Sequence, residues 1–222
     1  MRSSGVFVTL GSFVILTATQ LSVFADTLTF RQGDGGAYSE TQGASVSPFL
    51  GGGTGTETIL HAHTVVDIPV EIAFLSFPDI IGSNPGQIPP GSTIDYATLD
   101  LVRVNDSVNV AYLSLVSGAW DENTINGSNY PGTSGSAGSI AAGGAGIHGI
   151  ANVKGAVQAW ASGTENWGLE ISVAYSQNSI EERFYSDDSL TQDYRPLLTV
   201  TFTPPPNAVA HTTWGEIKAL YQ

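Results

Sequence analysis

Two pairs of residues in this chain have the types and spacing that could support chemistry. Asp121 and Glu122 are adjacent carboxylates, but the two carboxyl groups of a glycosidase face each other across the bond they cleave. Neighbouring residues on a strand point to opposite faces, so this pair does not predict catalysis. His61 and His63 are two residues apart. That spacing places both imidazoles on one face of a strand and allows a metal-binding pair, although no third ligand stands at a recognisable spacing.

Four aspartates in expected loops form a second candidate metal site. Oxygen ligands from loops bind calcium in many proteins, and the candidates here are Asp34, Asp187, Asp188 and Asp193. Aspartate is also a common turn residue, because its side chain bonds to the nearby backbone. A structural calcium ion is therefore one expectation, and ordinary turns are the other.

The composition limits both the partners and the chemistry. The chain has 222 residues, of which 20 are Asp or Glu and 7 are Lys or Arg, for a net charge of −13. This acidic balance argues against nucleic-acid partners, which need basic surfaces. The chain contains no cysteine, which excludes disulfides, thiolate metal sites and a cysteine nucleophile. With 41% hydrophobic residues, the length suits one domain with short appendages.

The N-terminus has the pattern of a secretory signal peptide. Arg2 supplies the positive charge, residues 6–21 form an apolar stretch broken by Thr, Ser and Gly, and Val23-Phe24-Ala25 is a small-residue cleavage site. Cleavage after Ala25 removes one Arg and no acid, so the net charge becomes −13 − 1 = −14. The sequence therefore predicts a secreted, extracellular or cell-surface protein. A retained membrane anchor is the alternative, for which the apolar stretch is short.

Alternating apolar residues bounded by turn residues predict about ten strands in this chain. The longest covers residues 93–105, and 109–116 is expected to return beside it as an antiparallel hairpin. Residues 146–175 predict a strand, a short helix that carries Trp160, and a second strand. The segment 126–144, rich in Gly, Ser and Ala, is expected to be a mobile loop.

These elements predict an all-β fold, a jelly-roll-like antiparallel β-sandwich with one short helix and a short C-terminal tail. The expected organisation is a signal peptide over residues 1–25, the sandwich over 26–203, and a Pro linker with an amphipathic tail over 204–222. In the tail, the apolar side chains at helical spacing are Trp214, Ile217 and Tyr221. This stripe is expected to dock a surface-anchoring or assembly partner, to fold back on the sandwich, or to be disordered.

An ordered set of short motifs carries a resemblance to a known family. The motifs are Leu75-Ser76-Phe77, residues 87–101, Ala119-Trp120-Asp121-Glu122, Ala151-Asn152-Val153, Ala156-Val157-Gln158-Ala159-Trp160, Asn166-Trp167-Gly168-Leu169 and Arg195-Pro196-Leu197-Leu198-Thr199-Val200. In this order they resemble the DNRLRE-type β-sandwich domains, which are related to disaggregatase-associated modules and alginate-type carbohydrate-binding modules. The resemblance covers about residues 26–203 and implies a sandwich that binds carbohydrate.

The chain departs from that family pattern at two places. Thr124-Ile125-Asn126 stands where the family usually has a threonine-tryptophan pair, and Asn152-Val153-Lys154 stands where it usually has Asp-Val-Thr. Any role of the family's carboxylate at the second place therefore does not carry over to this chain.

Aromatic and basic side chains are the expected sugar-binding residues, because aromatic faces stack on sugar rings and Arg pairs with carboxylates. Three tryptophans, Trp120, Trp160 and Trp167, are expected to pack in the core instead. The remaining candidates are the loop aromatics and two mid-strand arginines: Tyr38, Tyr130, Tyr185, Tyr194, Arg103 and Arg183. The alternatives are ordinary surface tyrosines and solvated or ion-paired arginines. A neutral glycan fits the acidic chain at least as well as an acidic one.

The expected function is carbohydrate binding without catalysis by an exported protein, at the cell surface or in the extracellular matrix, with polysaccharide as the partner. The alternative is a structural subunit of a surface layer, matrix or appendage. A polysaccharide-degrading enzyme is the third reading. A glycan screen separates the first two, because a subunit forms polymers and shows no saturable glycan binding.

Overall fold

The computed structural model describes residues 24–34, 38–49, 51–66, 68–174 and 178–206. The expected signal peptide falls almost wholly outside these ranges, and so does the tail stripe of Trp214, Ile217 and Tyr221. Within the described ranges, no helix is long and apolar enough to cross a membrane.

The described residues form antiparallel strands, one short α-helix and one 3₁₀ turn. The strands are β1 (Asp26–Phe30), β2 (Gln42–Val46), β3 (Gly53–Thr54), β4 (Ile59–Val65), β5 (Ile68–Ser76), β6 (Thr93–Val102), β7 (Ala111–Val116), β8 (Thr133–Ile140), β9 (His148–Asn152), β10 (Leu169–Val173), β11 (Ile180–Tyr185) and β12 (Leu197–Thr203). The helix α1 spans Lys154–Ala161, and the 3₁₀ turn η1 spans Gln192–Tyr194.

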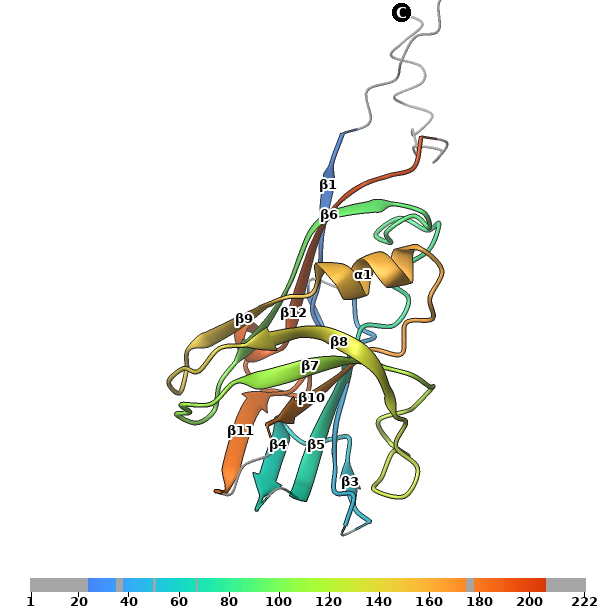
Figure 1. Cartoon of the computed structure of the whole chain (residues 1–222). Coiled ribbons are helices and arrows are strands. Elements are labelled where there is room, and N and C mark those ends of the chain that lie inside the picture. Colours follow the sequence, from blue (N-terminus) through green and yellow to red (C-terminus); the bar gives the residue numbers. More distant parts are fainter. Residues whose placement is uncertain (1–23, 35–37, 50, 67, 175–177, 207–222) are drawn as a thin grey trace, which may run out of the picture.

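The strands belong to two curled sheets that form a sandwich (Figure 1). One sheet has the order β1-β12-β6-β9. The other has the order β11-β4-β5-β10-β7-β8, and β2 joins it by pairing with β5 and β3. The named strands pair antiparallel throughout. The all-β sandwich with one short helix that the sequence predicts is therefore confirmed.

Alternating burial along the strands builds one main core between the sheets. On β12, Leu198, Val200 and Phe202 are buried, while Thr199 and Thr201 on the opposite face are half-exposed. A period of two is what a strand needs when only one of its faces packs on the core. A smaller cluster around Phe74 forms on the other face of β2 and β5, which makes β5 a strand covered on both faces.

The helix α1 closes the sandwich beside β6 (Figure 1). Its buried side chains include Ala156, Val157 and Trp160, and Trp160 is only 3% exposed. The Gln158 side chain fixes the helix to the strand, since its Oε1 accepts a hydrogen bond from the backbone N–H of Ile94 at 2.8 Å. The prediction that Trp160 packs in the core is confirmed.

The predicted hairpin of residues 93–105 and 109–116 is wrong, because β6 and β7 lie in different sheets. The connection between them crosses from one sheet to the other. It is held by a hydrogen bond from the Val104 N–H to the Arg183 carbonyl at 2.8 Å and by an antiparallel bridge between Ser107 and Gly143. Both strands alternate correctly, but alternation does not say which strand is the neighbour.

The prediction of a mobile loop over residues 126–144 is also wrong, because this segment contains β8. Strand β8 pairs with β7 through the register Ala111↔Ile140 to Val116↔Thr133. A Cβ on Gly138 would lie 2.7 Å from the Asn152 carbonyl oxygen. The small residues therefore let the backbones of β8 and β9 approach closely. From composition alone, the same residues predict a flexible loop.

Candidate functional site

Four ionisable side chains gather on the outer face of β4, β5 and β11. Alternation along β4 buries Leu60, Ala62 and Thr64 and turns His61 and His63 outward. The strand register then places Glu181 of β11 and Glu71 of β5 on either side of His63. We call His61, His63, Glu71 and Glu181 the His–Glu cluster.

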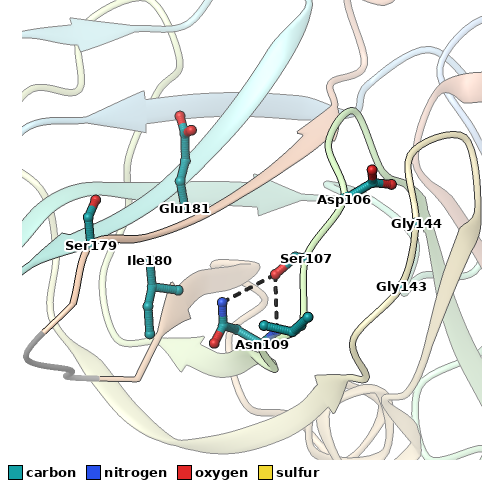
Figure 2. A pocket seen from close by; sticks show the side chains of 9 residues that line it. Asp106, Ser107, Asn109, Gly143, Gly144, Ser179, Ile180 and Glu181 are labelled. Carbon is teal, nitrogen blue, oxygen red and sulfur yellow. Dashed lines mark hydrogen bonds between the residues drawn. The ribbon is translucent and has the colours of Figure 1, made fainter.

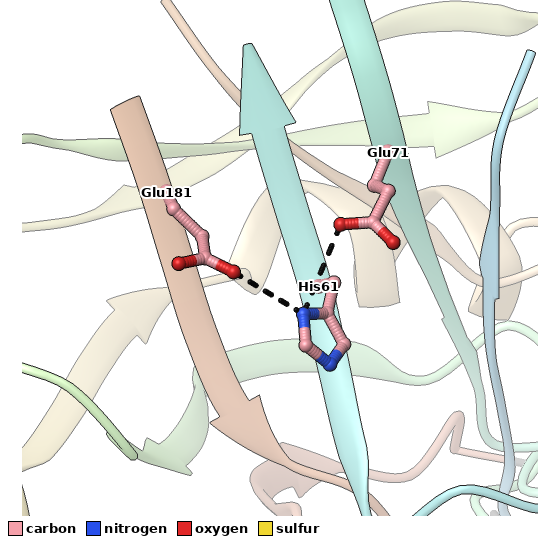
Figure 3. Close-up of side chains that lie close together, drawn as sticks. All are labelled: His61, Glu71 and Glu181. Atoms are coloured by element: carbon pink, nitrogen blue, oxygen red, sulfur yellow. Dashed lines mark ion pairs between the residues drawn. The ribbon is translucent and has the colours of Figure 1, made fainter. Parts of the chain in front are cut away.

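The closest atoms of the His–Glu cluster meet at His61 (Figure 3). Its Nδ1 lies 3.4 Å from Glu181 Oε1 and 3.8 Å from Glu71 Oε2. His63 Nδ1 is 3.9 Å from the same Glu71 oxygen. Among the His, Asp and Glu side chains in the described part of the chain, one group of three could hold a metal ion. It consists of His61, Glu71 and Glu181, whose potential ligand atoms all lie within 4.8 Å of one another.

Neighbouring groups hold two members of the cluster in place. Arg183 Nε lies 3.7 Å from Glu181 Oε2, the oxygen that does not face His61. Ser179 Oγ is 2.9 Å from His63 Nε2, the ring nitrogen that does not face Glu71. Sequence reasoning found the two histidines on one face but missed both glutamates, because they enter through strand register and not through sequence spacing.

An open cleft of about 430 Å³ lies beside β11 (Figure 2). We call it the loop cleft: it is bounded by residues 106–109 after β6, by Gly143 and Gly144 after β8, and by residues 179–181 at the start of β11. Its polar lining includes carboxylate, hydroxyl and amide groups, and Asn109 donates from its backbone and its side chain to Ser107 Oγ. Glu181 belongs to both the loop cleft and the His–Glu cluster, so the two features adjoin.

The outward side of β11 continues from the cleft to an aromatic pair. Glu181, Arg183 and Tyr185 alternate with the buried Glu182 and Phe184 and so share the outer face. The Tyr194 ring, from η1, lies 4.8 Å from the Tyr185 ring between centroids and is 39% exposed. We call the set Glu181, Arg183, Tyr185 and Tyr194 the β11 face. It brings together three of the six predicted sugar-binding residues.

Arg103 is not available to a surface ligand, and its prediction as a sugar-binding residue is wrong. The side chain is 1% exposed and forms an ion pair with Glu182, which is itself fully buried. It also donates to the Ala141 carbonyl and lies over the Phe184 ring, 5.1 Å from its centroid. Ser107 Oγ donates to the other Glu182 oxygen. Arg103 therefore links β6, β11 and the end of β8 from within the fold.

Two predicted loop tyrosines serve packing in the structure. Tyr38 is half-buried against Phe30 and Phe77, and its hydroxyl donates to the Pro78 carbonyl at 2.8 Å. Burial, followed by the charge of Glu40, raises the Tyr38 pKa well above its ordinary value. Tyr130 lies against the smaller core.

The smaller core also receives two of the tryptophans. Phe74 is 6.1 Å from the Tyr130 ring and 5.7 Å from the Trp120 ring between centroids. The Trp120 indole N–H donates to the Trp167 carbonyl at 2.8 Å. Both tryptophans are half-buried against this cluster, in line with the expectation that they pack instead of binding ligand.

The four predicted calcium ligands are not all brought together. Asp193 pairs with Arg31 at 3.3 Å, and Asp34 lies in the turn after β1, where its N–H donates to the Arg31 carbonyl. Asp187 and Asp188 sit side by side after β11, with Asp187 buried and Asp188 exposed. Asp34 is therefore an ordinary turn residue, whereas Asp187 is buried.

Asp187 is a buried carboxyl group near the half-buried Glu122, an environment that sequence reasoning did not anticipate. Asp187 is 3% exposed, and its Oδ1 has no hydrogen-bond partner among the described residues. Burial, with a further contribution from the charge of Glu122, raises the Asp187 pKa to about 7. Burial is also the largest cause that raises the Glu122 pKa, although Glu122 Oε2 accepts a bond from the Gly43 N–H at 3.3 Å.

Asp121 and Glu122 have separate structural contacts. They lie at a turn and not on a strand. Asp121 Oδ1 accepts a hydrogen bond from the Asn123 N–H at 3.0 Å, whereas Glu122 faces Gly43 and Asp187. Each carboxylate is therefore engaged in a local contact of its own.

The fold and the outer sheet surface define an antiparallel β-sandwich with a polar, partly aromatic face along β11. No protein-family model matches the chain, and no curated protein matches it.

Proposed function

We propose that this chain is an exported, non-catalytic carbohydrate-binding sandwich, and that sugar lies along the β11 face. The observation that carries the proposal is the Tyr185–Tyr194 pair, of which Tyr194 is exposed and Tyr185 half-buried, in line with Arg183 and Glu181. Aromatic faces stack on the apolar faces of sugar rings. The charged side chains beside them would bond to sugar hydroxyls.

The dimensions of this surface suit an extended chain. Glu181 and Tyr185 are four residues apart on one strand, which corresponds to roughly 13 Å at about 3.3 Å per residue. The loop cleft adjoins the Glu181 end, and its volume of about 430 Å³ falls within the usual range of small-ligand pockets. The proposed ligand thus has one ring in the cleft and another on the tyrosines.

Charge favours a neutral glycan over an acidic one. The chain has 20 acidic and 7 basic residues. On the β11 face, the Arg183 guanidinium already lies beside Glu181, so it offers little free positive charge to a carboxylated sugar. The resemblance to DNRLRE-type domains, which are related to alginate-type modules, supports sugar binding in general but not this choice of glycan.

The test is a glycan screen on the exported protein with two matched tyrosine variants. Tyr194→Ala removes the exposed ring of the β11 face, and Tyr96→Ala removes a ring that is 53% exposed on the other sheet. The proposal expects saturable binding that Tyr194→Ala weakens and Tyr96→Ala leaves unchanged. Absence of any glycan signal, or the reverse ranking of the variants, would contradict it.

A structural subunit is the second candidate, and one observation favours it. The outer face of the sheet β1-β12-β6-β9 exposes Tyr96 by 53% and Ile150 by 60% between rows of threonines such as Thr199 and Thr201. This surface carries the His148–Asp100 ion pair, and its apolar and threonine side chains could pack on a second copy of the chain. Sedimentation over rising protein concentration tests it: polymers that Ile150→Asp dissolves would support the subunit.

A polysaccharide-degrading enzyme is the third candidate, because Asp106 and Glu181 both line the loop cleft. Asp106 Oδ1 accepts a hydrogen bond from the Ala145 N–H at 2.8 Å, which gives that carboxylate a structural role. A reducing-sugar assay with the glycans that bind in the screen separates this candidate. If the original chain releases reducing ends and Glu181→Gln does not, the protein is a hydrolase and not a binding module.

A further inference from the structure

We propose that the His–Glu cluster binds one divalent transition-metal ion of the zinc type on the outer face of β4, β5 and β11. His61, Glu71 and Glu181 supply three ligands, and His63 supplies the fourth. This site adjoins the proposed sugar-binding face, because Glu181 belongs to both.

The spacing of the ligand atoms fits a tetrahedral ion. Zinc lies about 2.0–2.1 Å from histidine nitrogens and carboxylate oxygens, so a regular tetrahedron puts neighbouring ligand atoms about 3.3 Å apart. His61 Nδ1 is 3.4 Å from Glu181 Oε1 and 3.8 Å from Glu71 Oε2. The three ligand atoms all lie within 4.8 Å of one another, so binding requires side-chain rotations that bring them to about 3.3 Å.

The fourth ligand stands beside the other three but outside their 4.8 Å group, so its ring must turn toward the ion. His63 Nδ1 lies 3.9 Å from Glu71 Oε2, while its Nε2 lies 2.9 Å from Ser179 Oγ. A ligating imidazole commonly donates its other N–H to a neighbouring oxygen, which fixes the ring and its tautomer. Ser179 provides that oxygen here, and Arg183 does the equivalent for Glu181 by taking its second carboxylate oxygen.

The donor set selects the class of metal. Imidazole with carboxylate suits zinc and the neighbouring late transition metals, whereas calcium takes six to eight oxygen ligands. Two carboxylates and two neutral imidazoles bring a charge of about −2, which balances a divalent ion. An ion can reach the site from solvent, because the side chains of His61 and Glu181 are 22% and 36% exposed.

The experiment is calorimetric titration of the tag-free chain with zinc chloride, since an affinity tag of histidines would itself bind zinc. We expect one ion per chain. His61→Ala should lower the affinity by more than the roughly 10–100-fold that is typical of losing a supporting residue. Glu71→Gln keeps the size of the side chain and should also weaken binding, so a folding defect in one variant does not decide the result.

The matched control is His148→Ala on the other sheet. His148 Nδ1 also contacts a carboxylate, Asp100, at 2.9 Å, but it has one acidic partner instead of two. The proposal expects His148→Ala to bind zinc like the original chain, and it expects calcium chloride to give no heat. No saturable zinc binding, equal losses in His61→Ala and His148→Ala, or a response to calcium alone would overturn it.

Discussion

Asp187→Asn is expected to stabilise the fold at pH 8, although it changes a buried polar residue. Asp187 is 3% exposed, its Oδ1 has no partner among the described residues, and a Cβ on Gly43 would lie 2.3 Å from that oxygen. Burial and the nearby Glu122 charge raise its pKa from 3.8 to about 7. The folded chain therefore holds this proton more tightly than the unfolded chain does.

The sign and the size of the effect follow from that pKa. Below about pH 4 the aspartic acid is protonated in both states and costs nothing. As the pH rises from there to about 7, ionisation favours the unfolded chain, and the cost is constant at higher pH. At about 1.4 kcal/mol per pH unit, the rise from 3.8 to about 7 sets an upper limit of roughly 4 kcal/mol.

The assay is thermal unfolding of both proteins between pH 4 and pH 8. Asparagine carries no charge, so the variant should match the original chain at pH 4 and exceed it by about 2–4 kcal/mol at pH 8, a midpoint rise of at least about 5 °C for a domain of this size. Asp188→Asn, at the exposed neighbour, is the control and should stay within about 0.5 kcal/mol.

Two results would refute this reasoning. A variant that is less stable than the original chain at pH 8 would mean that the carboxylate is needed in its charged form. Stabilisation by calcium of the original chain but not of Asp187→Asn would instead place the predicted calcium site around this residue, with its carboxylate charged.

Three further predictions concern the core and the connections. Arg103→Met should cost about 3–5 kcal/mol in urea unfolding because it leaves the Glu182 carboxylate buried and unpaired, and the double variant with Glu182→Gln should recover most of the loss. Trp160→Ala should cost about 3–5 kcal/mol with or without sugar; an unchanged melting temperature would contradict its place in the core. Gly138→Val should destabilise the fold by about 1–3 kcal/mol because a Cβ would press on the Asn152 carbonyl, and hydrogen exchange should then show faster exchange in β8 and β9 if the close approach is real.

The sequence predicts the strands well because their alternation reflects a single buried face. Leu198, Val200 and Phe202 show this alternation. The four-and-three spacing in the same way predicts the buried face of α1 that carries Trp160. Sheet membership could not be read in the same way. The short linker after β6 looks like a hairpin turn, yet it crosses to the other sheet because β6 pairs with β12 and β9.

The candidate site was predictable only where its residues are neighbours in sequence. His61 and His63 share a face by spacing alone, whereas Glu71 and Glu181 reach them through pairing of β4 with β5 and β11. Arg103 misled the prediction for the opposite reason. A mid-strand arginine is usually exposed, and its burial here depends on Glu182, which comes 79 residues later in the chain.

The central claim is that sugar binds along the β11 face, and the most direct test is an affinity measurement with a glycan that binds in the screen. We expect Tyr194→Ala to weaken that affinity at least about tenfold, or about 1.4 kcal/mol, while Tyr96→Ala stays equal to the original chain. Equal affinities for the original chain and Tyr194→Ala, with a loss in Tyr96→Ala, would move the binding surface to the other sheet and contradict the claim.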